Sequence, residues 1–157
     1  YIPSGTVHAL GKGVMVYELQ QSSDVTYRLY DWDRLDKGKK RELHIEKAIE
    51  SIKPHNFISL SDITNIYEME SKGHNLLTIG NYKYFKAKFV SLKNEESIIQ
   101  ACDEVRIITA IYGHGFLDFK DNRMLLKKGD TVVLPKASDE CVNIIGDGML
   151  RYIEATV

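Results

Sequence analysis

Short hydrophobic segments with a period of two residues run through most of this sequence, and they constrain its fold more than any other feature. Alternating apolar and polar residues place successive side chains on opposite faces of an extended strand. Gly and Asn tolerate positive φ, so Gly80-Asn81 and Gly146-Asp147-Gly148 predict hairpin turns. The segments predicted as strands from residue 63 onward are 63–69, 75–79, 82–92, 97–101, 105–112, 115–119, 123–127, 131–134, 141–145 and 149–156. Strands this short and this closely spaced indicate an all-β antiparallel barrel or sandwich.

The first third of the chain has the same alternation of apolar and polar residues and is followed by one predicted helix. Residues 14–19 and 25–30 alternate and predict two further strands. Residues 35–42 are strongly charged and are interpreted as a solvated connection. The apolar residues of 44–52 recur at helical spacing, and Pro54 ends the predicted helix.

Composition excludes several classes of protein. Hydrophobic residues make up 43% and charged residues 27% of the 157 residues, which is too apolar for a disordered chain. The formal net charge of -1 offers no electrostatic reason to bind nucleic acid or an anionic membrane. Apolar runs such as 107–112 are far shorter than the roughly 20 residues of a membrane-spanning helix. Cys102 and Cys141 are too few for a disulfide scaffold, so a cytoplasmic location is expected.

An imperfect internal repeat indicates two related β units. Residues 2–8 align with 134–140, each copy having a strand end and a proline turn. Each copy is followed by a Gly-x-Gly sequence, at 11–13 and at 146–148. The chain begins at Tyr1 with what reads as the middle of a strand, so the first unit is expected to be truncated at its upstream end.

Three residues are candidates for chemistry. His8 follows the turn Pro3-x-Gly5 and could ligate a metal, although a single His is more often packed or solvated. Arg28 is a permanent cation on a predicted strand face, where it needs an anion or water unless it simply points outward. Glu18 falls on the predicted inward face, where a carboxylate is costly unless it is paired or functional.

Three stretches are similar to the type I mannose-6-phosphate isomerase family, in its short bacterial branch: 1–13, 18–34 and 41–45. The resemblance extends through the whole chain and implies that the chain is the C-terminal part of such a protein. It implies a cupin (bicupin) jelly-roll fold with a truncated first barrel and one short connecting helix near 44–52. The implied domains are the remainder of the first, catalytic barrel at 1–34, a charged connection and helix at 35–62, and a second, metal-free barrel at 63–157.

The resemblance also implies a function, with assigned residues. Family members interconvert mannose 6-phosphate and fructose 6-phosphate, so a zinc-dependent aldose–ketose isomerase acting on a hexose 6-phosphate is expected, with one Zn²⁺ per full-length chain. His8 matches one zinc ligand, and the other three, a Gln-x-His pair and a Glu, are expected upstream of Tyr1. Arg28 matches the catalytic arginine and Glu18 a residue of the substrate pocket. The chain by itself is expected to be inactive, and the general base and oligomeric state are not assigned.

A second interpretation has the same fold but no catalytic activity: a non-catalytic cupin module that binds a sugar or a protein. An upstream Gln-x-His and Glu would favour the enzyme, and a start codon near Tyr1 would favour the module. A cupin oxygenase is rejected, because it needs several His ligands in one barrel and His8 stands alone.

The second barrel is predicted to hold no metal. General cupin spacing places Gln100, Cys102, Arg106 and Glu140 at its four ligand positions. A guanidinium has no lone pair to offer a metal, so Zn²⁺ binding there is not expected. Arg106 and Glu140 are expected to approach each other across the barrel instead.

Overall fold

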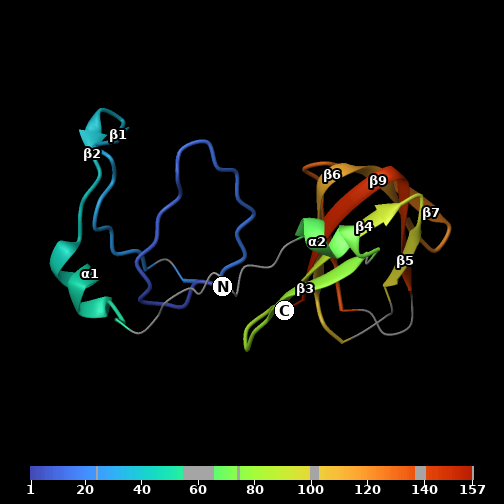
Figure 1. The fold of residues 1–157 in the computed structure, drawn as a ribbon, viewed down its shortest axis with the longest axis horizontal. Coiled ribbons are helices and arrows are strands. Elements are labelled where there is room, and N and C mark those ends of the chain that lie inside the picture. Colours follow the sequence, from blue (N-terminus) through green and yellow to red (C-terminus); the bar gives the residue numbers. More distant parts are fainter. Residues whose placement is uncertain (24, 55–65, 74, 100–102, 137–140, 157) are drawn as a thin grey trace. The chain divides into compact units, whose positions relative to one another are not determined.

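The computed structural model describes the chain except residues 24, 55–65, 74, 100–102, 137–140 and 157 (Figure 1). The chain divides into two compact units, Tyr1–Ile63 and Thr64–Val157, and each is described by itself. No helix among the described residues is long and apolar enough to cross a membrane.

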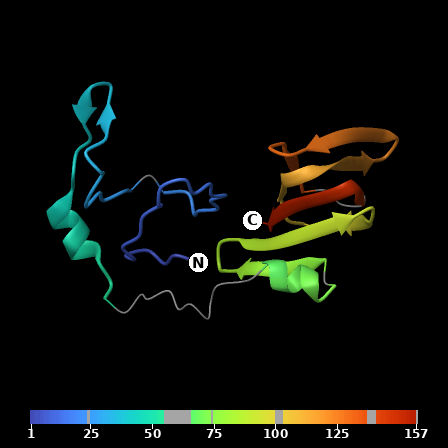
Figure 2. The ribbon, with the colours of Figure 1, turned by 45° about the horizontal axis from the view of Figure 1, so that its top comes forward.

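The first unit contains little regular structure. β1 (Leu35–Asp36) and β2 (Lys39–Lys40) form a two-residue antiparallel ladder, and α1 (Ile45–Ser51) follows (Figure 2). α1 lies within the predicted helix 44–52 and buries Ala48, while Ile45 and Ile49 remain exposed.

The strands predicted at 14–19 and 25–30 are wrong for this structure, in which the described residues of both segments have no strand hydrogen bonding. Val14 and Val25 are 58% and 64% exposed, so the apolar residues of these segments are largely outside any core. An extended segment becomes a strand only when a neighbouring segment accepts and donates its backbone hydrogen bonds. The assignment of 1–34 to a first barrel, and with it the bicupin arrangement, stays a prediction.

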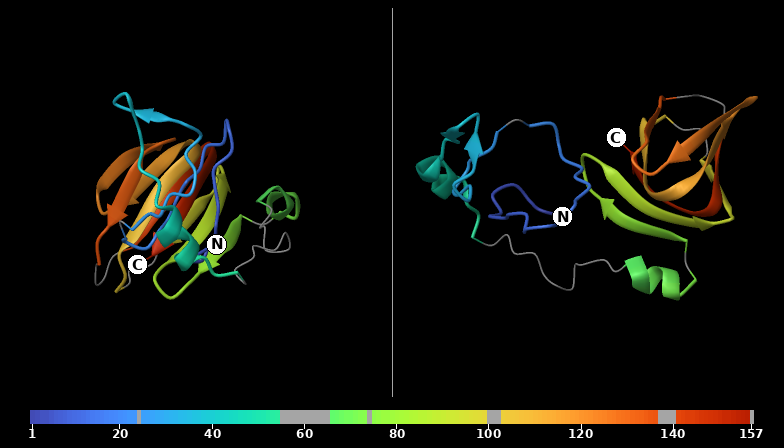
Figure 3. Two further views of the ribbon diagram at one scale, coloured as in Figure 1. Left: turned by 90° about the vertical axis from the view of Figure 1, so that its left-hand side faces the viewer. Right: turned by 90° about the horizontal axis from the view of Figure 1, so that it is seen from above.

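The second unit is an antiparallel jelly roll, which confirms the predicted all-β fold. The described strands are β3 (Leu76–Asn81), β4 (Lys86–Lys93), β5 (Glu96–Ile99), β6 (Arg106–Phe119), β7 (Asn122–Lys127), β8 (Thr131–Leu134) and β9 (Val142–Thr156). One half of the sheet runs β3-β4-β9-β6-β8, and the other runs β5-β9-β6-β7. The long strands β6 and β9 belong to both halves and curl the sheet around its core (Figure 3).

Glycines let the two long strands approach each other where they change from one half of the sheet to the other. Gly113 has φ +71°, and a Cβ atom there would lie 1.7 Å from the Met149 carbonyl oxygen. The register between β6 and β9 is irregular on both sides of this point, so the strands continue through a bulge. Gly146-Asp147-Gly148 therefore lies inside β9, and its prediction as a hairpin turn is wrong.

The same bulge merges predicted strands. Segments 105–112 and 115–119 form the single strand β6, and 141–145 and 149–156 form β9. A glycine that interrupts a period of two can mark either a turn or a bulge, and the neighbouring strand decides between them.

Two further predictions shift. The turn of the β3–β4 hairpin lies at Tyr82–Phe85, where the Tyr82 N–H donates to the Phe85 carbonyl over 2.9 Å, so Gly80-Asn81 ends β3.

Residues 66–69, predicted as strand, belong to the helix α2 (Ile66–Ser71), and the rest of that segment lies outside the described residues. The strand prediction failed here because periodicity alone cannot distinguish a short apolar strand from a short buried helix. Here Met69 is 5% exposed on α2, which shows that the helix is packed.

Apolar side chains from both halves of the sheet form one core. Those with at most 1% exposure include Leu92, Ile108, Leu126, Ile144, Leu150 and Tyr152. Because these positions alternate along their strands, the predicted period of two also identifies the inward face.

Candidate functional site

Arg28 is held by the segment that leads into α1. Its backbone N–H donates to His44 Nδ1 over 3.3 Å, and its carbonyl accepts from the His44 N–H over 2.8 Å. Its guanidinium donates from Nη1 to the Glu42 carbonyl over 3.2 Å and lies 3.9 Å from Asp31 Oδ1 through Nε. About a quarter of the Arg28 side chain, 24%, is exposed, so the group can still meet a ligand.

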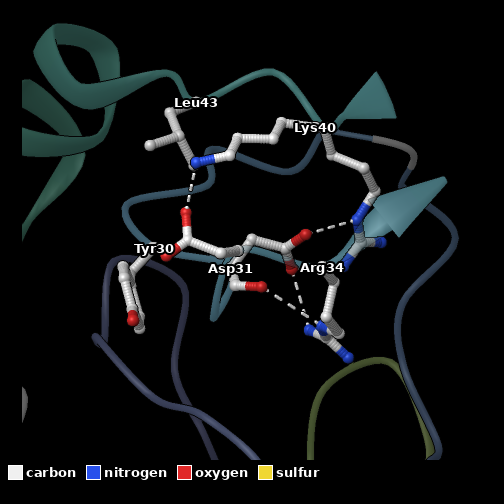
Figure 4. Close-up of a pocket in the computed structure, with 7 residues that line it drawn as sticks. Tyr30, Asp31, Arg34, Lys40 and Leu43 are labelled. Carbon is white, nitrogen blue, oxygen red and sulfur yellow. Dashed lines mark hydrogen bonds and ion pairs between the residues drawn. The ribbon is translucent and has the colours of Figure 1, made fainter. Parts of the chain in front are cut away.

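Asp31 is the centre of an arginine cluster that the sequence analysis did not identify. Its side chain is 7% exposed and accepts from Arg41 Nε at Oδ2 over 2.7 Å and from Arg34 Nη2 at Oδ1 over 2.8 Å. Arg41 Nη2 also donates to Oδ1. Figure 4 shows Asp31 with Arg34 and Lys40 around it. A signal was present in the spacing Arg28-x-x-Asp31-x-x-Arg34, which puts a carboxylate midway between two guanidinium groups.

The turn after Asp31 has an uncommon backbone conformation. Trp32 and Asp33 have φ values of +51° and +53°, and the Arg34 N–H donates to the Asp31 carbonyl over 3.0 Å. Positive φ is rare for a bulky residue such as tryptophan, and such conformations cluster at functional sites. The Arg34 guanidinium carbon lies 5.3 Å from the Trp32 ring centroid, which gives the cluster an aromatic wall.

The cluster carries an excess of positive charge. The Arg41 hydrogen bond, with Arg34, lowers the pKa of Asp31 from 3.8 to about 2, so this carboxylate stays ionised. Three guanidinium groups, those of Arg28, Arg34 and Arg41, therefore surround the Asp31 carboxylate, and Asp36 lies near enough to Arg41 to offset part of the remaining positive charge. The neighbouring Lys40–Asp33 pair, at 2.7 Å, is neutral as a whole.

A small cavity of about 70 Å³ opens at this cluster, lined by Tyr30, Asp31, Asp33, Arg34, Lys40, Arg41 and Leu43. Sites for whole small-molecule ligands usually measure about 300–1,000 Å³. The described cavity therefore has room for one polar group of a ligand, and its guanidinium groups favour an anionic one.

The other two predicted site residues are exposed and stand apart from these contacts. Glu18 is exposed, where the strand pattern had predicted an inward position, because its segment forms no sheet. His8 is also exposed, and its Nδ1 lies 2.9 Å from the Thr6 carbonyl. A hydrogen bond from Nδ1–H to a carbonyl leaves Nε2 with its lone pair, as metal-ligating histidines require.

The described residues do not complete a metal site. Among them, no group of three or more His, Cys, Asp and Glu side chains could hold an ion. Zinc needs four ligands, or three and a water, and His8 supplies one. The His8 imidazole can therefore serve as one zinc ligand, but the described residues together do not supply a full set of ligands.

In the second unit, Arg106 contacts an inward carboxylate of the neighbouring strand. Its Nη1 lies 3.6 Å from Glu154 Oε1, and Lys88 Nζ lies 3.9 Å from the same oxygen. Glu154 is 6% exposed, so Arg106 has a buried partner other than the predicted Glu140. Glu140, like Gln100 and Cys102, lies outside the described residues, so the predicted Arg106–Glu140 contact stays a prediction.

The closed antiparallel jelly roll of the second unit is the architecture of the cupins. No family model matches the sequence. The crystal structure of mannose 6-phosphate isomerase from Bacillus subtilis superposes with a TM-score of 0.63 at 33% identity, covering 86% of this chain and 41% of that one. The resemblance drawn from the sequence is confirmed: over 86% of its length the chain is similar to mannose-6-phosphate isomerases.

Sequence relatives support the same relationship. The mannose-6-phosphate isomerase ManA of Bacillus subtilis is 38% identical over 136 residues, and that of Streptococcus mutans is 36% identical over 143 residues. Each match covers 86% of this chain and 42% of the relative. The chain therefore spans less than half the length of the proteins it resembles.

Proposed function

We propose that this chain is the C-terminal part of a zinc-dependent aldose–ketose isomerase that interconverts mannose 6-phosphate and fructose 6-phosphate. The names of the relatives support the reaction and the hexose phosphate substrate. The observation that carries the proposal is the arginine cluster around Asp31, because it supplies fixed positive charge beside Arg28.

The charge of the cluster suits both the substrate and the reaction. A phosphate monoester carries a charge of about −2 near neutral pH, which the excess positive charge of the cluster attracts. Isomerisation moves a proton between C1 and C2 of the sugar, so negative charge develops on an enediolate. A cation held in place there, the role proposed for Arg28, stabilises the transition state more than the ground state.

His8 is proposed as one ligand of a single zinc ion through Nε2. The remaining ligands must come from residues other than those described, because the described donors are too few. When bound, zinc would supply Lewis-acid polarisation of a sugar oxygen. Glu18 is proposed as a residue of the substrate pocket, and the protein is proposed to act in the cytoplasm.

The alternative, a cupin module that binds without turnover, has one observation in its favour. The described strands of the second unit form a jelly roll, while the described residues of the chain supply no group of three metal-ligand side chains.

A comparison of the full-length protein with chain 1–157 separates the two functions. We expect the full-length protein to convert mannose 6-phosphate to fructose 6-phosphate and to contain about one zinc by elemental analysis. Chain 1–157 should show no turnover and no tightly bound zinc. A full-length protein that binds hexose 6-phosphates without converting them would support the module, and stoichiometric zinc on chain 1–157 would contradict the ligand assignment.

A further inference from the structure

The proposed function assigns no role to Asp31, although Asp31 lies at the centre of the arginine cluster. We propose that Asp31 is a positioning residue, whose carboxylate holds the Arg28 guanidinium in the orientation needed for isomerisation. The inference rests on the proposed function, since it assigns Asp31 a role that acts through Arg28.

The contacts of Arg28 show why the carboxylate matters. Two groups approach its guanidinium: the neutral Glu42 carbonyl at 3.2 Å and the ionised Asp31 carboxylate at 3.9 Å. A carbonyl fixes the direction of one N–H bond, whereas a carboxylate also attracts the whole cation. Glu42 therefore holds the Nη1 end of the guanidinium, and Asp31 attracts its Nε side through charge.

Asp31 also keeps the other two guanidinium groups from displacing Arg28. Arg34 and Arg41 both donate to Oδ1, the oxygen nearest Arg28, and Arg34 donates from Nε to the Asp31 carbonyl over 3.3 Å. Without the negative charge, three permanent cations would stand close together and repel one another. Arg28 would keep its 3.2 Å bond to the Glu42 carbonyl but lose its nearest anion, so its guanidinium is expected to turn away from Arg34 and Arg41.

Asp33 provides a matched control. It lies two residues away in the same turn and forms a 2.7 Å ion pair with Lys40. Its side chain is 71% exposed against 7% for Asp31, and its ion-pair partner is an ammonium group in place of a guanidinium. Asparagine at either position removes one carboxylate charge with little change in volume, so the two variants differ mainly in their surroundings.

Substitutions in the full-length enzyme test the inference through kinetics. Asp31→Asn should lower kcat by at least about tenfold with a smaller change in KM, because an interaction specific to the transition state is lost. In an Arg28→Ala background the same substitution should change kcat by less than about threefold, since residues that act as a unit are not additive. As an activity control, Glu46→Gln removes an exposed carboxylate of α1 that does not line the cavity, and it should stay within about twofold of the unchanged protein.

A spectroscopic measurement tests positioning without depending on turnover. In protein labelled with ¹⁵N at arginine Nε, the Arg28 Nε–H signal is identified by its loss in Arg28→Ala. It should exchange faster with water or disappear in Asp31→Asn and persist in Asp33→Asn. If Asp31→Asn fails to fold, Asp31→Glu keeps the charge but moves the carboxylate by one methylene, and the same loss of signal and of kcat is expected.

The outcomes distinguish the two levels of inference. An unchanged Arg28 signal and kcat in Asp31→Asn, or losses from Asp31→Asn and Arg28→Ala that multiply, would overturn the positioning role. A full-length protein that is inactive, yet loses the Arg28 signal in Asp31→Asn, would keep the positioning role and refute the proposed isomerase.

Discussion

Arg151 on β9 and Glu70 on α2 form an ion pair with two hydrogen bonds between elements far apart in the chain. Arg151 Nε donates to Glu70 Oε1 over 2.8 Å, and Nη2 donates to Oε2 over 2.7 Å. The Ser91 hydroxyl of β4 adds a 2.6 Å bond to Oε1 and is the main reason that the pKa of Glu70 lies below its ordinary value of 4.5. The pair fastens α2 to two neighbouring strands of the sheet.

Replacing Glu70 should therefore destabilise the second unit. Glu70→Ala removes three hydrogen bonds and leaves Arg151 three-quarters buried without its carboxylate, so a loss of about 1–3 kcal/mol in the free energy of unfolding is expected. Urea denaturation of Glu70→Ala and of the control Glu68→Ala measures the free energy of unfolding. Glu68→Ala, on the same helix, breaks an exposed pair with Lys72 and should cost less than about 0.5 kcal/mol. Equal losses would show that Glu70 has no special role.

Gly113 should be the least replaceable glycine of the long strands. Alanine there combines positive φ with a Cβ 1.7 Å from the Met149 carbonyl, so we expect a loss of about 3 kcal/mol or more, or failure to fold. Gly129→Ala separates the two effects, because φ is +96° and no atom lies within 4 Å of the added Cβ. Thermal unfolding should show a loss of about 1–2 kcal/mol for that control. A Gly113→Ala variant as stable as the control would contradict the close contact of β6 and β9.

Alkaline pH should lower the stability of the second unit through ionisation of Tyr152. Burial raises the pKa of this phenol from 10.0 to about 12, so between those values the unfolded chain releases a proton that the folded chain retains. The stabilising contribution is complete below pH 10 and is lost as pH rises through 12, by about 3 kcal/mol in all.

Denaturant unfolding at pH 9 and pH 11.5 measures this loss. Tyr152→Phe should remove most of the pH dependence, whereas Tyr84→Phe, at a tyrosine that is 54% exposed, should leave it unchanged. If Tyr152→Phe keeps the full dependence, another group is responsible.

Arg28 should be needed for turnover and dispensable for metal binding. In the full-length enzyme, Arg28→Ala should lower kcat by at least roughly a hundredfold, the scale of losing one preorganised charged contact. Zinc content should be unchanged. Arg28→Lys should rescue poorly, because an ammonium cannot reproduce the separate contacts of a planar guanidinium with Glu42 and Asp31. Activity within about threefold of the unchanged enzyme would rule out Arg28 as the catalytic cation.

Local pattern predicted much of the second unit because its strands alternate regularly. The inward positions of β9, such as Leu150 and Tyr152, follow from a period of two. The boundaries failed at glycines, since Gly146 and Gly148 are compatible with both a hairpin and a bulge. The pattern also predicted strands around Val14 and Val25, where the structure provides no partner strand.

The sequence by itself determined the β character of the second unit, the helix near 44–52 and the relationship to mannose-6-phosphate isomerases. These depend on local periodicity and on residue identity along the chain. Tertiary structure alone decided that Arg41 would join Asp31, because the segment carrying Arg41 must fold back beside Arg28 to bring the charges together. It likewise decided that β6 and β9 would be continuous, since a bulge exists only in the pairing of a strand with its neighbour.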